Sequence, residues 1–234
     1  MTKRLMALCL TSLLVFTGCG SSQPKPEERT AAELYDEGIA ELESGGYQLS
    51  IELFTKIKDW YPFSKHAVTA DLKIADAHFG LQAYDEAAMA YENFASLHPR
   101  NEAVPYAIYR IGNCYLEQVN GIDQDQTYAK KAHDSFQRLL NQFPDSEYKH
   151  PAEAAIKICR KSIIANEIYV AKYYLKMKNY KAALIRFKDA LNMYPDIGAQ
   201  FDALGYIASC ETALAQAKSE GTPAEASPEA PQTN

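Results

Sequence analysis

The sequence predicts an all-α protein built from repeated pairs of helices. Four times along the 234-residue chain, a small residue is followed four positions later by an aromatic residue and twelve positions later by a proline. The sets are Ser50–Phe54–Pro62, Ala87–Tyr91–Pro99, Ala132–Phe136–Pro144 and Ala183–Phe187–Pro195, and in three of them a tyrosine precedes the small residue by three positions (Tyr47, Tyr84 and Tyr180). A small residue lets two helices approach, the ring fills the gap between them, and proline ends the second helix.

This spacing is that of the tetratricopeptide repeat, whose helix pairs stack into a superhelix. We therefore predict an all-α tetratricopeptide-repeat superhelix of about four and a half helix pairs over residues 31–214. The predicted units span about 31–64, 68–101, 105–146 and 147–197, with a partial unit at 198–214. Because the open face of each unit needs its neighbour as cover, these residues form one array rather than two globular domains.

The units are bounded by residues that break or start helices. In the first unit Ser44-Gly45-Gly46 separates the two helices, and in the second unit Tyr84 opens the second helix. The third unit begins near Pro105, a residue suited to the first turn of a helix. Its two helices are separated by a loop at residues 118–126, which is longer than the standard connection of this repeat.

One long helix interrupts the regular repeat in the C-terminal part. Apolar spacing is continuous from Glu147 through Met177, and the end of this helix serves as the first helix of the fourth unit. Residues 180–194 complete that unit, and a helix from Gln200 to about Lys218 begins a fifth unit whose partner helix is missing. The polar, proline-bearing residues 215–234 are predicted to be a disordered tail.

The N-terminal residues have the layout of a secretory signal. Two basic residues precede an apolar stretch at residues 5–16, which is too short to cross a bilayer core of ~30 Å as a helix. Small residues directly before Cys19 are typical of a bacterial lipoprotein signal, so we predict a signal peptide at residues 1–18 and a lipid, including palmitate, on Cys19. An ordinary cleaved signal with an incidental cysteine is the alternative. Residues 19–30 then form a flexible tether that reaches at most ~30–35 Å.

Charge is segregated along a chain of net charge −6. From Glu27 to Asp125, eighteen acidic and seven basic residues give a balance of −11, whereas from Lys149 to Lys188, ten basic and two acidic residues give +8. One interpretation is that these blocks are only solvated helix faces; the other is that the two halves face different partners, the second of them acidic. The acidic total and the export signal disfavour a nucleic-acid partner.

The sequence predicts no catalytic residues, no metal and no cofactor. Cys114, Cys159 and Cys210 lie in apolar helical patterns without metal-type pairs, which favours a role as buried small packing residues. The histidines are scattered without catalytic or metal-binding spacing, at His66, His78, His98, His133 and His150.

The first helices of the units are expected to line a concave groove. By unit position, the inward-facing residues are Tyr35, Ile39, Leu42, Leu72, Asp76, Phe79, Tyr106, Tyr109, Asn113 and Leu116. Rings can cover the side chains of an extended apolar peptide, and an amide can bond its backbone. The candidate groove residues are accordingly Tyr35, Asp76, Phe79, Tyr106, Tyr109 and Asn113. Alternatively, several of the inward-facing residues only pack against the adjacent helix, and we expect about half of them to be exposed in the groove.

Five motifs are more specific than the repeat itself. They are Tyr61-Pro62-Phe63, Pro105-Tyr106-x-x-Tyr109-Arg110-x-Gly112, Phe143-Pro144-Asp145-Ser146-x-Tyr148, Glu167-x-x-Val170-Ala171-x-Tyr173-Tyr174, and Arg186 ahead of Tyr194-Pro195-Asp196. With the lipid signal, they resemble the BamD family, the tetratricopeptide lipoproteins of the β-barrel assembly machinery in Gram-negative outer membranes. Two departures are the shorter loop before Ala132 and the missing final helix of the fifth unit.

The resemblance implies a non-enzymatic protein held by its lipid at the periplasmic face of the outer membrane, where Gly20 after the cysteine also directs lipoproteins. It implies docking on the periplasmic domains of the barrel-forming subunit BamA, contact with other Bam lipoproteins, and delivery of unfolded outer-membrane proteins as clients of the groove. Arg186 stands at the position of the family's BamA-contacting arginine, and Lys172 and Lys176 are further docking candidates. The main alternative is another periplasmic repeat lipoprotein that coordinates peptidoglycan synthesis, a class that usually carries an N-terminal coiled coil.

Overall fold

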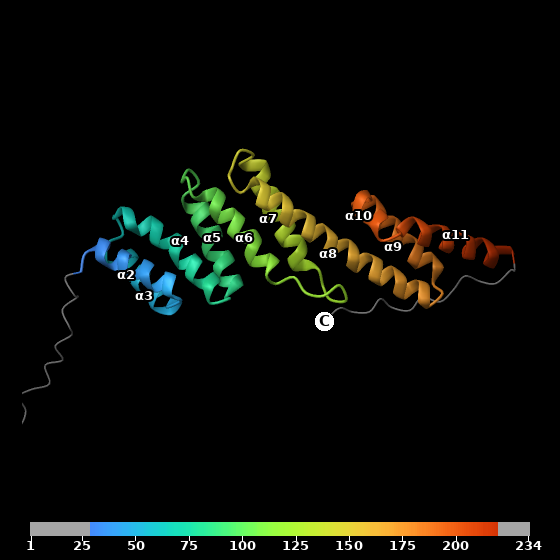
Figure 1. The fold of residues 1–234 in the computed structure, drawn as a ribbon, viewed down its shortest axis with the longest axis horizontal. Coiled ribbons are helices and arrows are strands. Elements are labelled where there is room, and N and C mark those ends of the chain that lie inside the picture. Colours follow the sequence, from blue (N-terminus) through green and yellow to red (C-terminus); the bar gives the residue numbers. More distant parts are fainter. Residues whose placement is uncertain (1–28, 220–234) are drawn as a thin grey trace, which may run out of the picture.

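The computed structural model describes residues 29–219, and all regular secondary structure in that range is α-helical. The helices are α2 (Ala31–Ser44), α3 (Tyr47–Trp60), α4 (Lys65–Gly80), α5 (Tyr84–Leu97), α6 (Val104–Leu116), α7 (Thr127–Gln142), α8 (Lys149–Lys176), α9 (Tyr180–Met193), α10 (Pro195–Gln200) and α11 (Ala203–Ser219). They follow one another along the long axis of the molecule, from α2 and α3 at one end to α9–α11 at the other (Figure 1). The predicted all-α repeat architecture is confirmed.

The repeated small and aromatic residues form the buried contact inside each helix pair. Ala87, Ala132 and Ala183 are fully buried, and so is each aromatic residue four positions later, as the spacing predicts. Close approach is most evident in the third unit, where a Cβ added to Gly112 would lie 2.5 Å from the ring of Phe136. Only glycine therefore lets α7 place its ring against α6 in this position.

Helix boundaries follow the capping residues of the sequence. Thr30 and Glu33 form a capping box at the start of α2, and Gly45 ends that helix in the left-handed region at φ 87°. Pro105 lies in the first turn of α6, as predicted. The predicted loop lies between α6 and α7 and is held by the buried side chain of Gln126, which bonds the Gly121 carbonyl at 3.0 Å.

The long helix α8 belongs to two hydrophobic clusters. Its first half, including Ile156 and Cys159, packs into the central cluster formed with α4–α7. Its second half, including Ile164 and Ile168, packs into the C-terminal cluster with α9–α11. Because one continuous helix contributes to both clusters, it fixes the last helix pair relative to the middle of the array.

The C-terminal end differs from the predicted boundaries. The short helix α10 follows Pro195 directly, and Ile197 and Gly198 bury it against α9 before α11 begins at Ala203. Helix α11 continues to Ser219, close to the helix end predicted near Lys218, so the array boundary at 214 is too early and residues 215–219 are not part of a disordered tail. Alanine at 213, 215 and 217 has high helix propensity and extends the helix. The predicted tail beyond Ser219 lies outside the described residues, as do the signal peptide, Cys19 and most of the tether.

The three cysteines of the array are buried, as predicted, and the structure has all three as free thiols. Burial raises the pKa of the Cys114 thiol to about 12 and that of Cys159 to about 11. Both thiols therefore stay protonated near neutral pH and act as small apolar residues. Between residues 29 and 219, no helix has both the length and the hydropathy needed to cross a bilayer.

Candidate functional site

The predicted groove residues of α4 and α6 meet in one hydrogen-bonded cluster. The carboxylate of Asp76 accepts hydrogen bonds from the hydroxyls of Tyr91 at 2.6 Å and Tyr106 at 2.7 Å, and from Nζ of Lys73 at 2.8 Å. Burial, together with the negative charge of Asp76, raises the pKa of both tyrosines, so their hydroxyls remain donors. The Asp76 side chain is only 11% exposed. Asp76 therefore organises the junction between α4, α5 and α6.

Arg110 covers the ring of Phe79 on the same cluster. Its guanidinium carbon lies 3.9 Å from the Phe79 ring centroid and 5.7 Å from the centroids of Tyr91 and Tyr106. Phe79 also meets the edge of the Tyr84 ring at 5.2 Å. The predicted groove residue Phe79 is thus half-buried beneath a cation, and its ring links neighbouring helices.

A continuous aromatic surface runs from α6 to the start of α8. The rings of Tyr109 and Tyr148 stack at 5.1 Å with an interplanar angle of 21°, and Tyr106 lies 5.9 Å from Tyr148. We call Tyr106, Tyr109 and Tyr148 the tyrosine surface. Asn113 lies one turn beyond Tyr109 on the same face of α6, and all four side chains are half-buried. Ring faces with a nearby amide are suited to an extended peptide.

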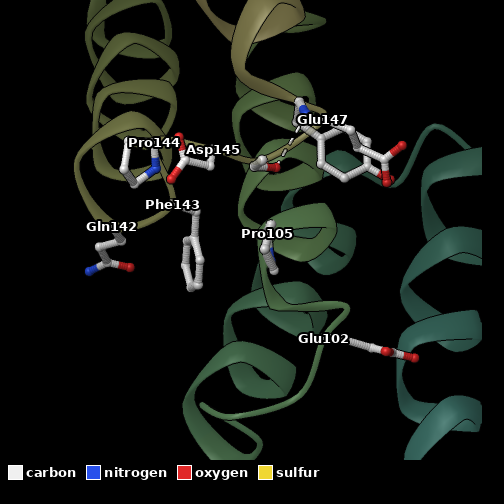
Figure 2. Close-up of a pocket in the computed structure, with 9 residues that line it drawn as sticks. Glu102, Pro105, Gln142, Phe143, Pro144, Asp145 and Glu147 are labelled. Atoms are coloured by element: carbon white, nitrogen blue, oxygen red, sulfur yellow. Dashed lines mark hydrogen bonds between the residues drawn. The ribbon is translucent and has the colours of Figure 1, made fainter.

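A pocket of about 480 Å³ opens beside the tyrosine surface (Figure 2). In Figure 2, Phe143 extends from the turn between α7 and α8, Pro105 marks the start of α6, and Glu102 lies beyond Pro105. The full lining consists of Glu102, Pro105, Gln142, Phe143, Pro144, Asp145, Ser146, Glu147 and Tyr148. Apolar rings with three carboxylates at the rim can hold an apolar side chain next to a cationic one.

The other predicted groove residues are distributed more widely. Tyr35 lies in the N-terminal cluster, where its ring is 5.6 Å from Phe54 and 4.9 Å from His66. Leu72 is 7% exposed and packs in the central core, so its assignment to an open groove is wrong. Ile39, Leu42 and Leu116 are half-buried. The structure therefore gathers the α4 and α6 residues into one area and leaves Tyr35 apart.

Arg186 lies at the edge between α8 and α9. Its Nη1 donates to Oε2 of Glu167 at 2.8 Å, and the two side chains are 39% and 17% exposed. The hydrogen bond to Glu167 raises the pKa of Arg186, which remains charged. Because the guanidinium is partly exposed and held in place by one carboxylate, its remaining N–H groups can donate to another.

Lys172 and Lys176, the further docking candidates, lie on a different face of α8 from Glu167. The five-residue step from Glu167 to Lys172 rotates about 140° around the helix, and Nζ of Lys172 lies 5.0 Å from the ring centroid of Tyr206 in α11. Lys176 shares this exposed face with Tyr169 and Tyr173, whose side chains are 48% and 40% exposed. The structure thus separates Arg186 from Lys172 and Lys176.

Sequence reasoning missed several residues that complete these surfaces. Tyr148 and Arg110 stood in the quoted motifs without a role. Contacts between helices show that Tyr148 joins Tyr109 at the α6–α8 junction and that Arg110 of α6 covers Phe79 of α4. The exposed pair Tyr169 and Tyr173 could have been found from its four-residue spacing opposite the apolar face of α8.

The fold and these surfaces define a class of protein: a helical-repeat protein with aromatic and charged side chains at its surface. In the part of the chain that the structure describes, no three histidine, cysteine or acidic side chains are grouped to hold a metal. The chain belongs to the outer membrane lipoprotein family YfiO, whose family model matches residues 27–225.

Three relatives from different organisms carry the name outer membrane protein assembly factor BamD. The protein from Rickettsia prowazekii (strain Madrid E) is 30% identical over 87% of this chain and 81% of its own length. That from Caulobacter vibrioides is 27% identical over 80% of this chain and 64% of its own length. The protein from Haemophilus influenzae is 26% identical over 86% of this chain and 80% of its own length.

Proposed function

We propose that this protein is a non-enzymatic scaffold of the outer-membrane β-barrel assembly machinery, held at the periplasmic face of the outer membrane by a lipid on Cys19. The family and the names of the relatives support a role in outer-membrane protein assembly. In this role the chain binds the periplasmic domains of the barrel-forming subunit BamA, other lipoproteins of the machinery, and unfolded outer-membrane proteins.

The observation that carries the proposal is the separation of two surfaces on one rigid array. The tyrosine surface and its pocket lie at the α6–α8 junction, whereas Arg186 lies at the edge of α9 near the C-terminal end. A scaffold that holds a client and a subunit together needs two such surfaces. Tyr148, which belongs to the tyrosine surface, immediately precedes the first residue of α8. Glu167 of the same helix bonds Arg186. One continuous helix therefore joins the two surfaces.

For client binding, we expect Tyr109→Ala to weaken binding of an extended peptide by roughly 2- to 10-fold. The change removes one ring face from the tyrosine surface, and an aromatic contact with a ring of the peptide contributes ~0.5–1.5 kcal/mol beyond burial. Fluorescence anisotropy with a labelled peptide from the last strand of an outer-membrane barrel protein measures the affinity. Met89→Ala, which removes an exposed apolar side chain from α5 outside the proposed surfaces, is the control. Equal affinities for Tyr109→Ala and wild type would rule out the tyrosine surface as the client site.

For membrane attachment, we expect Cys19→Ala to release the protein into the soluble periplasmic fraction while the array stays folded. Acyl chains contribute ~0.8 kcal/mol per buried methylene, and residues 29–219 contain no helix that could replace them as a membrane span. Fractionation of cells lacking BamA, followed by a salt wash, measures the retained protein. A variant that remains in the washed membranes would contradict the lipid assignment.

A further inference from the structure

The turn between α3 and α4 carries two unusually exposed aromatic side chains. Phe63 is 102% exposed and Trp60, the last residue of α3, is 44% exposed. Neighbouring Pro62 is exposed as well. We call the exposed side chains of Trp60, Pro62 and Phe63 the aromatic tip. Neither the Trp60 nor the Phe63 side chain belongs to a hydrophobic cluster among residues 29–219, and exposed apolar side chains that lie together mark a contact with a partner or a membrane.

The chain that leads to Cys19 leaves the array at this turn. The hydroxyl of Tyr61, between Trp60 and Pro62, donates to the backbone carbonyl of Arg29 at 2.7 Å. The Arg29 side chain also pairs with Glu37 of α2, so the first described residue is fixed from two sides. Arg29 follows Cys19 by ten residues, which span at most ~33–36 Å. A lipid on Cys19 would therefore hold Arg29 and this turn within ~33–36 Å of the bilayer surface.

Local charge also distinguishes this turn from the rest of the N-terminal half. Residues 27–125 have a balance of −11, yet residues 56–66 contain Lys56, Lys58 and Lys65 against the single acidic residue Asp59. Lys58 pairs with Asp71 at 2.6 Å, and Nζ of Lys56 lies 6.0 Å from the Trp60 ring centroid. Tryptophan settles at the headgroup level of a bilayer, and phenylalanine buries its ring at the boundary with the acyl chains. Nearby lysines are attracted to anionic lipids.

We propose that Trp60 and Phe63 form a membrane-contact element that enters the lipid interface next to the acyl anchor. This inference rests on the proposed lipid attachment at Cys19. With the α2–α3 end held against the bilayer, the opposite end with α9–α11 points away from this contact (Figure 1). The lipid then provides attachment, and the aromatic tip sets the orientation in which the array presents its binding surfaces.

Trp60 reports on this contact directly because it is the single tryptophan of the chain. The lipidated full-length protein is reconstituted into vesicles of phosphatidylethanolamine and phosphatidylglycerol and compared with the soluble Cys19→Ala protein. We expect a shift of the Trp60 emission to shorter wavelength, quenching by brominated phospholipid, and reduced quenching by aqueous iodide. Phe63→Ser should diminish all three effects, whereas Met89→Ser, which removes a 61% exposed apolar residue from α5, should leave them unchanged.

Flotation of the same vesicles separates failure of the contact from failure of the anchor. A protein that floats with the vesicles but has the emission and iodide quenching of the soluble chain overturns the membrane contact and leaves the lipid anchor standing. A protein that does not float overturns both. A blue shift that grows with protein concentration in the absence of vesicles would also contradict the proposal, since a second copy of the chain would then cover the tip.

Discussion

Replacing Arg186 by glutamate is expected to weaken docking on the periplasmic domains of the barrel-forming subunit by ~2–5 kcal/mol, the typical effect of removing one partner from a desolvated charge pair. Arg186 is partly exposed and already oriented by Glu167 at 2.8 Å, so it offers a positioned donor to a carboxylate of the partner. Titration of the purified periplasmic domains against wild-type and variant protein measures the change in Kd. Unchanged affinity would remove Arg186 from the docking surface.

The ion pair with Glu167 calls for a second variant. Arg186→Glu alone places two carboxylates together at the α8–α9 edge, and the partly buried Glu167 loses its partner, so the melting temperature also falls. The charge-swapped protein Arg186→Glu/Glu167→Arg restores the internal pair and should recover thermal stability without recovering docking. If the charge-swapped protein docks as tightly as wild type, Arg186 acts only by holding α9 against α8.

Enlarging Ala183 to leucine is expected to lower the free energy of unfolding by ~1–3 kcal/mol or more, because the crossing of α8 and α9 has no room for a larger side chain. Ala183 is fully buried in the C-terminal cluster beside Phe187. Ala87→Leu should act similarly at the crossing of α4 and α5, where Ala87 is also fully buried. Thermal and urea denaturation of the single variants measures both effects.

An exposed alanine provides the control for these two variants. Ala154 lies on the exposed side of α8, so Ala154→Leu changes the same atoms without filling a packed crossing. Its midpoint should stay close to that of wild type. Midpoints of Ala87→Leu and Ala183→Leu that match Ala154→Leu would mean that the contacts between helices differ from those described.

Much of the architecture could be predicted because it depends on local chemistry. The spacing from Ala132 to Phe136 and Pro144 specifies a helix, its packing residue and its end within a dozen positions, and the structure has each of them in place. The long helix α8 was equally predictable, since its apolar period runs without a break from end to end. The end of the last helix near Lys218 was also predictable, whereas the short helix α10 after Pro195 and the start of α11 at Ala203 were not.

The binding surfaces depend on contacts between distant residues, which periodicity does not encode. Asp76 fits the pattern of a groove residue, yet two tyrosine hydroxyls from α5 and α6 occupy its carboxylate. Lys172 and Arg186 share a basic segment of the sequence. In the structure, Lys172 on one face of α8 lies against Tyr206 of α11, whereas Glu167 on another face of α8 bonds Arg186 of α9. Which side chains remain available to a partner is decided by these pairings.

Affinity purification from detergent-solubilised envelopes tests the central claim most directly. The lipidated protein, tagged at its C-terminus, is isolated from cells with and without the Arg186→Glu/Glu167→Arg charge swap, and the copurified proteins are identified by mass spectrometry. The scaffold assignment predicts that wild type recovers a large barrel protein with periplasmic domains in stoichiometric amount, and that the folded charge-swapped protein loses it. Recovery of peptidoglycan-synthesis proteins in place of that barrel protein would contradict the assignment.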